Sequence, residues 1–115
     1  STEEAYINPS LEEDYYESVR RAIENIMGPD DTYLEVFEED MKYSDTPIAA
    51  SLSEGLTDIF QSVYNFIEMI KPDPLALAPE ALAAIKEDFE SYWSQILCNN
   101  LRALNKIKYS SSDID

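Results

Sequence analysis

Apolar residues spaced three or four positions apart dominate this chain and restrict it to helical folds. The clearest run places ten apolar side chains on one helical face: Ile48, Ala49, Leu52, Leu56, Ile59, Phe60, Val63, Phe66, Ile67 and Ile70. This spacing follows the 3.6-residue turn of an α-helix. We predict that the helix is capped by Asp45 or Thr46, takes Pro47 as its first residue and ends near Met69, before Pro72.

Two further stretches carry the same period. The first is predicted to be capped at Asn8 or Ser10 and to end at Gly28. The second is predicted to run from Pro79 to about Lys108, with a bend at Asn99-Asn100. Their apolar stripes are Leu11, Tyr15, Val19, Ala22, Ile23 and Ile26, and Leu82, Ile85, Phe89, Trp93, Ile96, Leu97, Leu101, Leu104 and Ile107. The proline-rich segment 71–80, before the last helix, is predicted to be an extended connector.

Residues 31–40 are ambiguous, because Thr32 to Phe37 fits either a strand or a short helix. No other strand-like run offers a pairing partner, so the short helix is favoured. The predicted fold class is therefore all-α, an antiparallel bundle of three long helices plus one short helix. We predict a single domain over residues 1–109 and a flexible tail over residues 110–115.

Charge and composition exclude several classes of function. The 115 residues carry a net charge of −16, and residues 1–45 hold 14 acids against three bases. This field disfavours nucleic acid and membranes and favours a basic protein partner. Histidine is absent, which excludes His-dependent triads and zinc motifs. The single cysteine, Cys98, excludes a disulfide within the chain and is predicted to be a buried hydrophobe.

Carboxylates provide the only candidates for a metal site. Glu54 and Asp58 lie four residues apart on one predicted helix, and Glu87, Asp88 and Glu90 lie on the last. Such oxygen ligands would suit Ca²⁺, Mg²⁺ or Mn²⁺. In a chain with 24 acids, however, a solvated helix surface explains them better. We therefore predict no catalytic, cofactor-binding or metal residue, and no cofactor.

The segment from Tyr43 to Phe60, YSDTPIAASLSEGLTDIF, is rich in small polar residues. It lacks the glycine spacing and the lysine of a phosphate-binding loop. Ser51 and Ser53 are predicted to lie on the helix surface, and Gly55 to mark the close approach of another helix. What remains is a possible interaction surface made of Tyr43, Glu54 and Asp58.

Two segments resemble a known family. They are DDTYLEVFEEDMKYSDTPIAASLSEGLTDIFQSVYNFI and DFESYWSQILCNNLRALNKI, and they are similar to small acidic bacterial proteins grouped as a domain of unknown function. The resemblance covers roughly Asp30 to Ile107, and it implies an all-helical fold and a bacterial cytoplasmic origin, with no activity or ligand. The chain departs from it at Gly55, where a larger residue is expected.

Three functions remain open after this reading. The first is a non-enzymatic module for protein–protein interaction or self-association, such as a homodimer. The second is an acidic immunity-type or nucleic-acid-mimic inhibitor of a basic partner. The third is a carboxylate-based divalent-metal binder or enzyme. No basic segment followed by an apolar core opens the chain, so the expected location is cytoplasmic.

Overall fold

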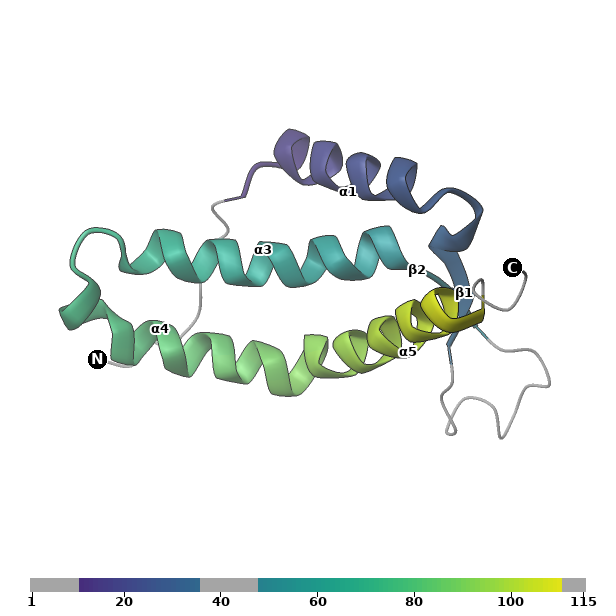
Figure 1. Ribbon diagram of the computed structural model, residues 1–115. Helices are drawn as coiled ribbons and strands as arrows, with labels where there is room; N and C mark the ends of the chain where they lie inside the picture. Colours follow the sequence, from purple (N-terminus) through teal and green to yellow (C-terminus); the bar gives the residue numbers. More distant parts are fainter. Residues whose placement is uncertain (1–10, 36–47, 111–115) are drawn as a thin grey trace.

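The structure is a computed structural model that describes residues 11–35 and 48–110 (Figure 1). Its helices are α1 (Glu13–Met27), α3 (Leu52–Ile70), α4 (Pro74–Asp88) and α5 (Ser94–Ser110). A 3-10 turn follows α1 at Gly28–Asp31, and a π-helical segment, Phe89–Trp93, joins α4 to α5. Strands β1 (Thr32–Leu34) and β2 (Ala49–Ser51) form a small antiparallel sheet. The predicted all-α class is thus broadly confirmed, with a short sheet added.

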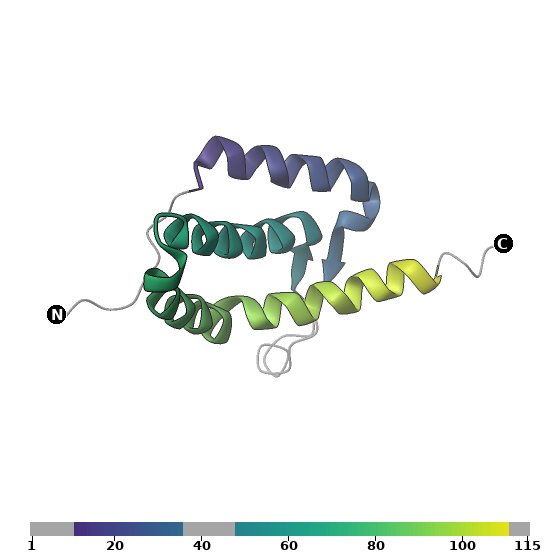
Figure 2. The same ribbon diagram turned by 60° about the vertical axis from the view of Figure 1, so that its left-hand side comes forward.

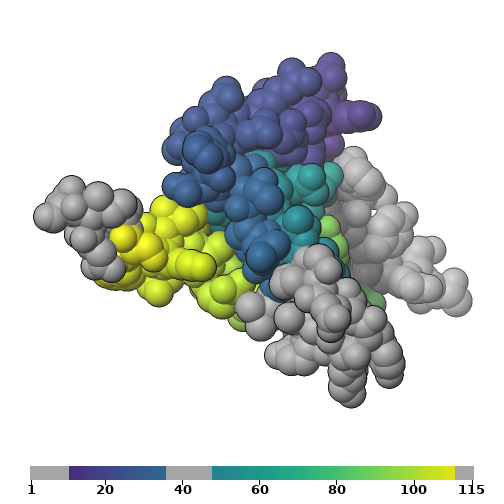
Figure 3. Space-filling view, turned by 90° about the vertical axis from the view of Figure 1, so that its right-hand side faces the viewer, coloured from purple at the N-terminus to yellow at the C-terminus, as the bar shows by residue number. Residues whose placement is uncertain are grey.

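The helices form one open layer (Figures 1 and 2). Helix α3 lies in the middle, α1 packs along one of its sides, and α4 and α5 pack along the other. Each neighbour runs antiparallel to α3. Among the described residues, α1 has no extended contact with α4 or α5, so the layer is not closed into a bundle. The C-terminal part of α5 projects beyond the other elements (Figure 3).

Helix α1 ends as its sequence predicts and begins later. Gly28 follows the last helical residue with φ 58°, and its N–H donates to the Glu24 carbonyl. Such a left-handed residue at a helix end favours glycine. At the other end Glu12 holds the cap position without a side-chain hydrogen bond. The predicted caps Asn8 and Ser10 lie outside the described residues.

The helix predicted over residues 31–40 is wrong for its described part. Thr32–Leu34 is a strand that pairs with Ala49–Ser51, in a register that places Tyr33 opposite Ala50. A further bond from the Glu35 N–H to the Ile48 carbonyl, at 2.8 Å, continues the pairing. The partner strand was hidden because Ile48 and Ala49 also fit the helical period of the following helix. Residues 36–40 lie outside the described part of the chain.

Helix α3 begins at Leu52 rather than at Pro47. The Ser51 hydroxyl accepts the Glu54 N–H at 3.0 Å and caps the helix. The Ser51-x-x-Glu54 spacing is a capping-box signature that the sequence analysis did not use. The predicted caps, Asp45 and Thr46, and Pro47 lie outside the described residues. The predicted end near Met69 agrees with the observed end at Ile70.

The connector predicted before the last helix is wrong, since residues 74–80 form the start of α4. Asp73 caps this helix through the Ala76 N–H, and Pro74 takes its first position. A proline there loses no helical hydrogen bond. The bend predicted at Asn99-Asn100 is also misplaced, because the irregular turn is the π-helical segment Phe89–Trp93. Ser110 still belongs to α5, and the predicted tail beyond it lies outside the described residues.

Small and polar side chains fill the interior of the layer. The buried apolar residues are Leu11, Leu52, Ala81, Ala84 and Ala103, and the buried polar ones are Asp31, Ser53, Thr57, Ser62, Asn65 and Asn100. The prediction that Ser53 lies on the surface is therefore wrong. Its N–H and hydroxyl both donate to Asp31, at 2.8 and 2.7 Å. Cys98 is exposed, contrary to prediction.

Candidate functional site

The predicted interaction surface does not persist as one unit. Tyr43 lies outside the described residues. Glu54 is exposed near the start of α3, whereas Asp58 is half-buried and accepts hydrogen bonds from two other elements. Asp58 is thus part of the packing between helices, and Glu54 alone remains a free surface group of this set among the residues described.

Asp58 joins three helical segments. One of its oxygens accepts the Tyr16 hydroxyl of α1 at 2.5 Å, and the other accepts the Tyr92 hydroxyl of the π-helical segment at 2.7 Å. One turn further along α3, the Ser62 hydroxyl donates to Asp88 at 2.6 Å. Hydrogen bonds to a carboxylate are among the stronger ones in proteins. We call Tyr16, Asp58 and Tyr92 the tyrosine clamp.

The tyrosine clamp is suited to holding helices and poorly suited to proton transfer. Burial and the bond to Asp58 raise the pKa of Tyr16. The bond to Asp58, followed by burial, raises the pKa of Tyr92 to about 12. Both hydroxyls therefore stay protonated near neutral pH and act as donors. A general base or nucleophile would need a pKa shifted in the opposite direction.

The carboxylates proposed as metal ligands do not converge. Within residues 11–35 and 48–110, no three acidic or cysteine side chains lie close enough together to hold a metal ion. Asp58 and Asp88 are occupied by hydroxyl donors, and Glu87 and Glu90 are exposed on the helix surface. The metal-binding alternative gains no support from this geometry.

Large apolar side chains gather instead on one side of the helical layer. In α3, Val63 and Ile67 are exposed, and each follows an acid, Glu54 or Asp58, by nine residues. Nine residues make two and a half turns, so the apolar pair lies opposite the acids. Helix α3 therefore separates an apolar side of the layer from an acidic one.

Helix α4 continues the apolar side. Its buried Ala81 and Ala84 face α3. Leu75 and Leu82 of α4, with Phe89 directly after its end, form a stripe with a spacing of seven, about a third of a turn away. Helix α4 runs antiparallel to α3 (Figure 1). For two right-handed antiparallel helices, this rotation places the stripe on the side of Val63 and Ile67. Leu75 is 92% exposed and Leu82 54% exposed.

Helix α1 completes this surface from the other edge. The Tyr15 ring meets Phe60 and Tyr64 of α3 edge-on, with centroid distances of 6.0 and 5.8 Å. Ile26 lies three turns after Tyr15 on the same stripe and is 80% exposed. We call the combined surface the apolar face; it comprises Tyr15, Ile26, Val63, Ile67, Leu75, Leu82 and Phe89.

The opposite side of the layer is acidic. Glu80 and Glu87 of α4 are each five residues from a leucine of the apolar face, which turns them about 140° away from it. Both are exposed, as is Glu54 of α3. On α1, Glu13 lies about one turn before Tyr16, which bonds Asp58 on this side, and Glu24 lies three turns after Glu13; both are exposed. We call this surface the acidic face; it comprises Glu13, Glu24, Glu54, Glu80 and Glu87.

Helical periodicity alone did not predict the apolar face, although it marked every residue of that face except Leu75, which fell in the predicted connector. Helical periodicity identifies which side of a helix is apolar, and we assigned that side to a core. A closed bundle would have buried these residues, whereas the open layer leaves them at the surface. One signal was present in the sequence: an acid, Glu54 or Asp58, lies nine residues before each of Val63 and Ile67. This spacing already divides α3 into an acidic and an apolar side.

No described helix is both long and apolar enough to cross a lipid bilayer. The exposed apolar side chains form a lateral surface of the helical layer. Contiguous apolar patches of this kind mark contacts with other protein surfaces or with ligands.

Comparisons with known proteins place the chain without assigning it an activity. A family model described as "Domain of unknown function (DUF5063)" matches residues 1–110. The crystal structure of protein BF1032 from Bacteroides fragilis, a structural-genomics target, is similar with a TM-score of 0.73 and 27% sequence identity. The similarity covers 95% of this chain and 61% of the Bacteroides chain, so this chain spans less than two thirds of that protein. No curated protein matches the sequence.

Proposed function

We propose, from the premise that this chain belongs to the DUF5063 family, that it is a non-enzymatic helical module that associates with a second copy of itself through the apolar face. The observation that carries the proposal is the concentration of exposed large apolar side chains on one side of an open helical layer. Leaving such a surface in water is unfavourable by roughly 25 cal/mol per Å².

The distribution of charge supports a second copy as the occupant. A net charge of −16 would repel another copy at most orientations. The apolar face carries none of the acids of the acidic face, so a twofold contact between two apolar faces keeps those acids on the outside. The molecule measures 55 × 33 × 24 Å, and its broad side exceeds the roughly 800 Å² per partner of a standard interface.

Sedimentation of two matched variants tests this proposal. Leu82 and Ala83 are adjacent and exposed on α4, but only Leu82 belongs to the apolar face. Leu82→Asp should remove concentration-dependent association, because it places a charge in the contact. Ala83→Asp adds the same charge to the other side and should leave association unchanged. A wild-type chain that stays monomeric up to millimolar concentration would overturn self-association.

The length of the Bacteroides protein suggests what a monomeric result would mean for the apolar face. The similarity leaves 39% of the Bacteroides chain without a counterpart here. If this chain is monomeric, the apolar face is better explained as a surface that binds a different protein partner. In that case Leu82→Asp should weaken binding of such a partner, and Ala83→Asp should not.

The acidic face supports a second candidate function, the binding of a basic protein partner. Its exposed carboxylates lie on three helices and face one direction, as an inhibitor that imitates nucleic acid would require. Steering by such a field weakens steeply as salt screens it. Affinity for a basic probe such as lysozyme should therefore fall with rising salt, and Glu54→Gln with Glu87→Gln should weaken it further. An affinity insensitive to salt contradicts this function.

A further inference from the structure

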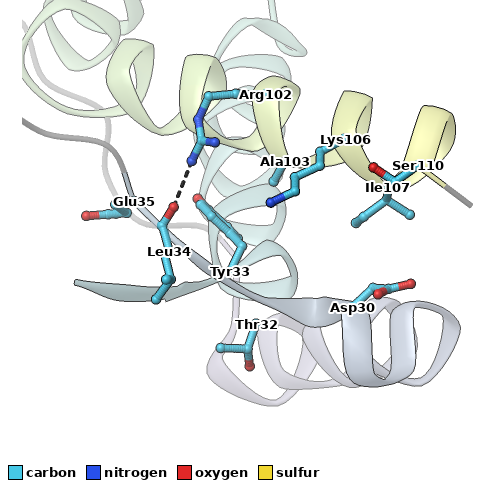
Figure 4. A pocket seen from close by; sticks show the side chains of 10 residues that line it. All are labelled: Asp30, Thr32, Tyr33, Leu34, Glu35, Arg102, Ala103, Lys106, Ile107 and Ser110. Atoms are coloured by element: carbon cyan, nitrogen blue, oxygen red, sulfur yellow. Dashed lines mark hydrogen bonds between the residues drawn. The ribbon is translucent and has the colours of Figure 1, made fainter. Parts of the chain in front are cut away.

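A pocket separate from the apolar face lies between β1 and α5 (Figure 4). Its volume is about 490 Å³, which is within the range of sites for small molecules. Strand β1 contributes Tyr33 and Leu34, and α5 contributes Arg102, Ala103, Lys106 and Ile107. The pocket exists because Thr32–Leu34 is a strand, which the sequence analysis had predicted to be helical.

Two cations share this pocket. Arg102 donates from Nη2 to the Leu34 carbonyl at 2.7 Å, which fixes its guanidinium at one end and leaves its other N–H groups available. Lys106 lies one turn later on α5 and points toward Tyr33 (Figure 4). Within the described part of the chain, neither side chain has a carboxylate partner within ion-pair distance.

Three other cations of the described residues have ion pairs, whereas Lys86 and Lys108 have none there. Arg20 and Arg21 pair with Glu17, and Lys71 pairs with Glu68, each on its own helix or at its end. What distinguishes Arg102 and Lys106 from Lys86 and Lys108 is that both line one cavity. They provide adjacent donors for an anion.

The rest of the lining restricts the size and charge of that anion. The Tyr33 ring, Ala103 and Ile107 offer an apolar wall, and the Tyr33 hydroxyl is held by Asn100 Oδ1 at 2.9 Å. Asp30 and Glu35 also line the pocket, and in Figure 4 their carboxylates lie at its ends, away from the space between Lys106 and Tyr33. Two acids at the rim disfavour a polyanion such as phosphate and leave a single negative charge as the best match.

We propose that this pocket binds a small organic monocarboxylate. Its carboxylate accepts hydrogen bonds from Arg102 and Lys106, and its flat apolar body lies against Tyr33. This inference is independent of the proposed self-association, because the pocket and the apolar face share no residue.

Benzoate serves as the probe, and benzamide serves as its neutral analogue of nearly equal shape. In ¹⁵N-labelled protein, benzoate should shift the amide signals of Tyr33, Ala103 and Lys106 in a saturable manner. Benzamide should require at least about tenfold higher concentration, which corresponds to roughly 1.4 kcal/mol. Equal effects of the two probes, or no saturable shift with benzoate, would overturn the proposal.

A lysine pair provides the matched variants. Lys106→Met removes the charge and retains an unbranched side chain, and it should weaken benzoate binding about tenfold or more. Lys86→Met makes the same change at an exposed position of α4 outside the pocket. This variant should bind benzoate as the wild type does. If both variants bind benzoate equally well, Lys106 is not a ligand of the anion. The same spectra report whether each variant is folded.

Discussion

Gly55 and Asn100 meet where α3 crosses α5, and this pair shows how single residues set the spacing of the layer. A Cβ atom at Gly55 would lie 2.5 Å from Asn100 Nδ2 and 2.8 Å from Oδ1. Asn100 is fully buried, and its Oδ1 accepts the Tyr33 hydroxyl, so the amide has little freedom to retreat. This is the close approach that the sequence predicted from a glycine inside a helix.

We expect Gly55→Ala to lower the free energy of unfolding by about 1–3 kcal/mol, because overpacking outweighs the gain of about 1 kcal/mol in helix propensity. Urea denaturation measures the change. In an Asn100→Ala background the obstructing amide is absent, and Gly55→Ala should cost less or become stabilising. Additive effects of the two substitutions would contradict the steric explanation.

The tyrosine clamp is a second feature of single residues, and it predicts how the free energy of unfolding depends on pH. The folded-state pKa of Tyr92 is raised from 10.0 to about 12, and that of Tyr16 is raised in the same direction. Their contribution is fully present below pH 10, where both states hold the proton, and is lost as pH rises toward 12, because only the unfolded state then releases it. Stability should therefore fall above pH 10.

Urea denaturation from pH 8 to pH 12 measures this loss, since 10.0 and about 12 bound the window set by Tyr92. Tyr92→Phe removes that titrating group, so its stability should fall less steeply with pH than that of the wild type. Tyr109→Phe changes an exposed tyrosine outside the clamp and serves as the control. An identical pH profile for Tyr92→Phe and the wild type would show that the clamp does not couple to folding.

At the scale of elements, helix periods and helix ends were predictable, whereas strand pairing was not. Helix α1 ends just before Gly28 and α3 ends just before Pro72, near the predicted positions. The pairing of Thr32–Leu34 with Ala49–Ser51 depends on contacts between segments distant in sequence. Likewise Asp31 accepts the Ser53 N–H at the start of α3, a contact across 22 residues that no local pattern encodes.

The prolines of α4 give a prediction about a single element. Pro79 lies inside the helix and has no N–H to donate to the Leu75 carbonyl, whereas Pro74 takes the first position, where no such bond exists. Pro79→Ala should therefore raise the free energy of unfolding by about 1–3 kcal/mol. Pro74→Ala should give no gain. Thermal and urea unfolding of the two variants make the comparison, and an equal effect at both positions would contradict it.

At the scale of the whole molecule, the sequence identified the apolar side of each helix but not what covers it. Periodicity in Val63, Ile67 and the α4 leucines is the same whether those residues enter a core or an interface. Whether these residues are buried or exposed depends on how many helical layers the molecule contains. The described residues form one layer, so the same residues become a surface. The radius of gyration, 17.0 Å, exceeds the about 13 Å typical of a compact chain of this length.

The net charge of −16 acts on this molecule as a whole, and it predicts that salt stabilises the fold. Raising ionic strength from about 0.01 to about 0.1 M shortens the screening length from roughly 30 to roughly 10 Å, well below the 55 Å long axis. Repulsion among the acids then falls, while the partly buried Arg20–Glu17 pair loses little. The melting temperature should rise with salt, and Glu87→Lys should reduce that dependence. Scans at two protein concentrations separate this effect from association, and a melting temperature that falls with salt contradicts it.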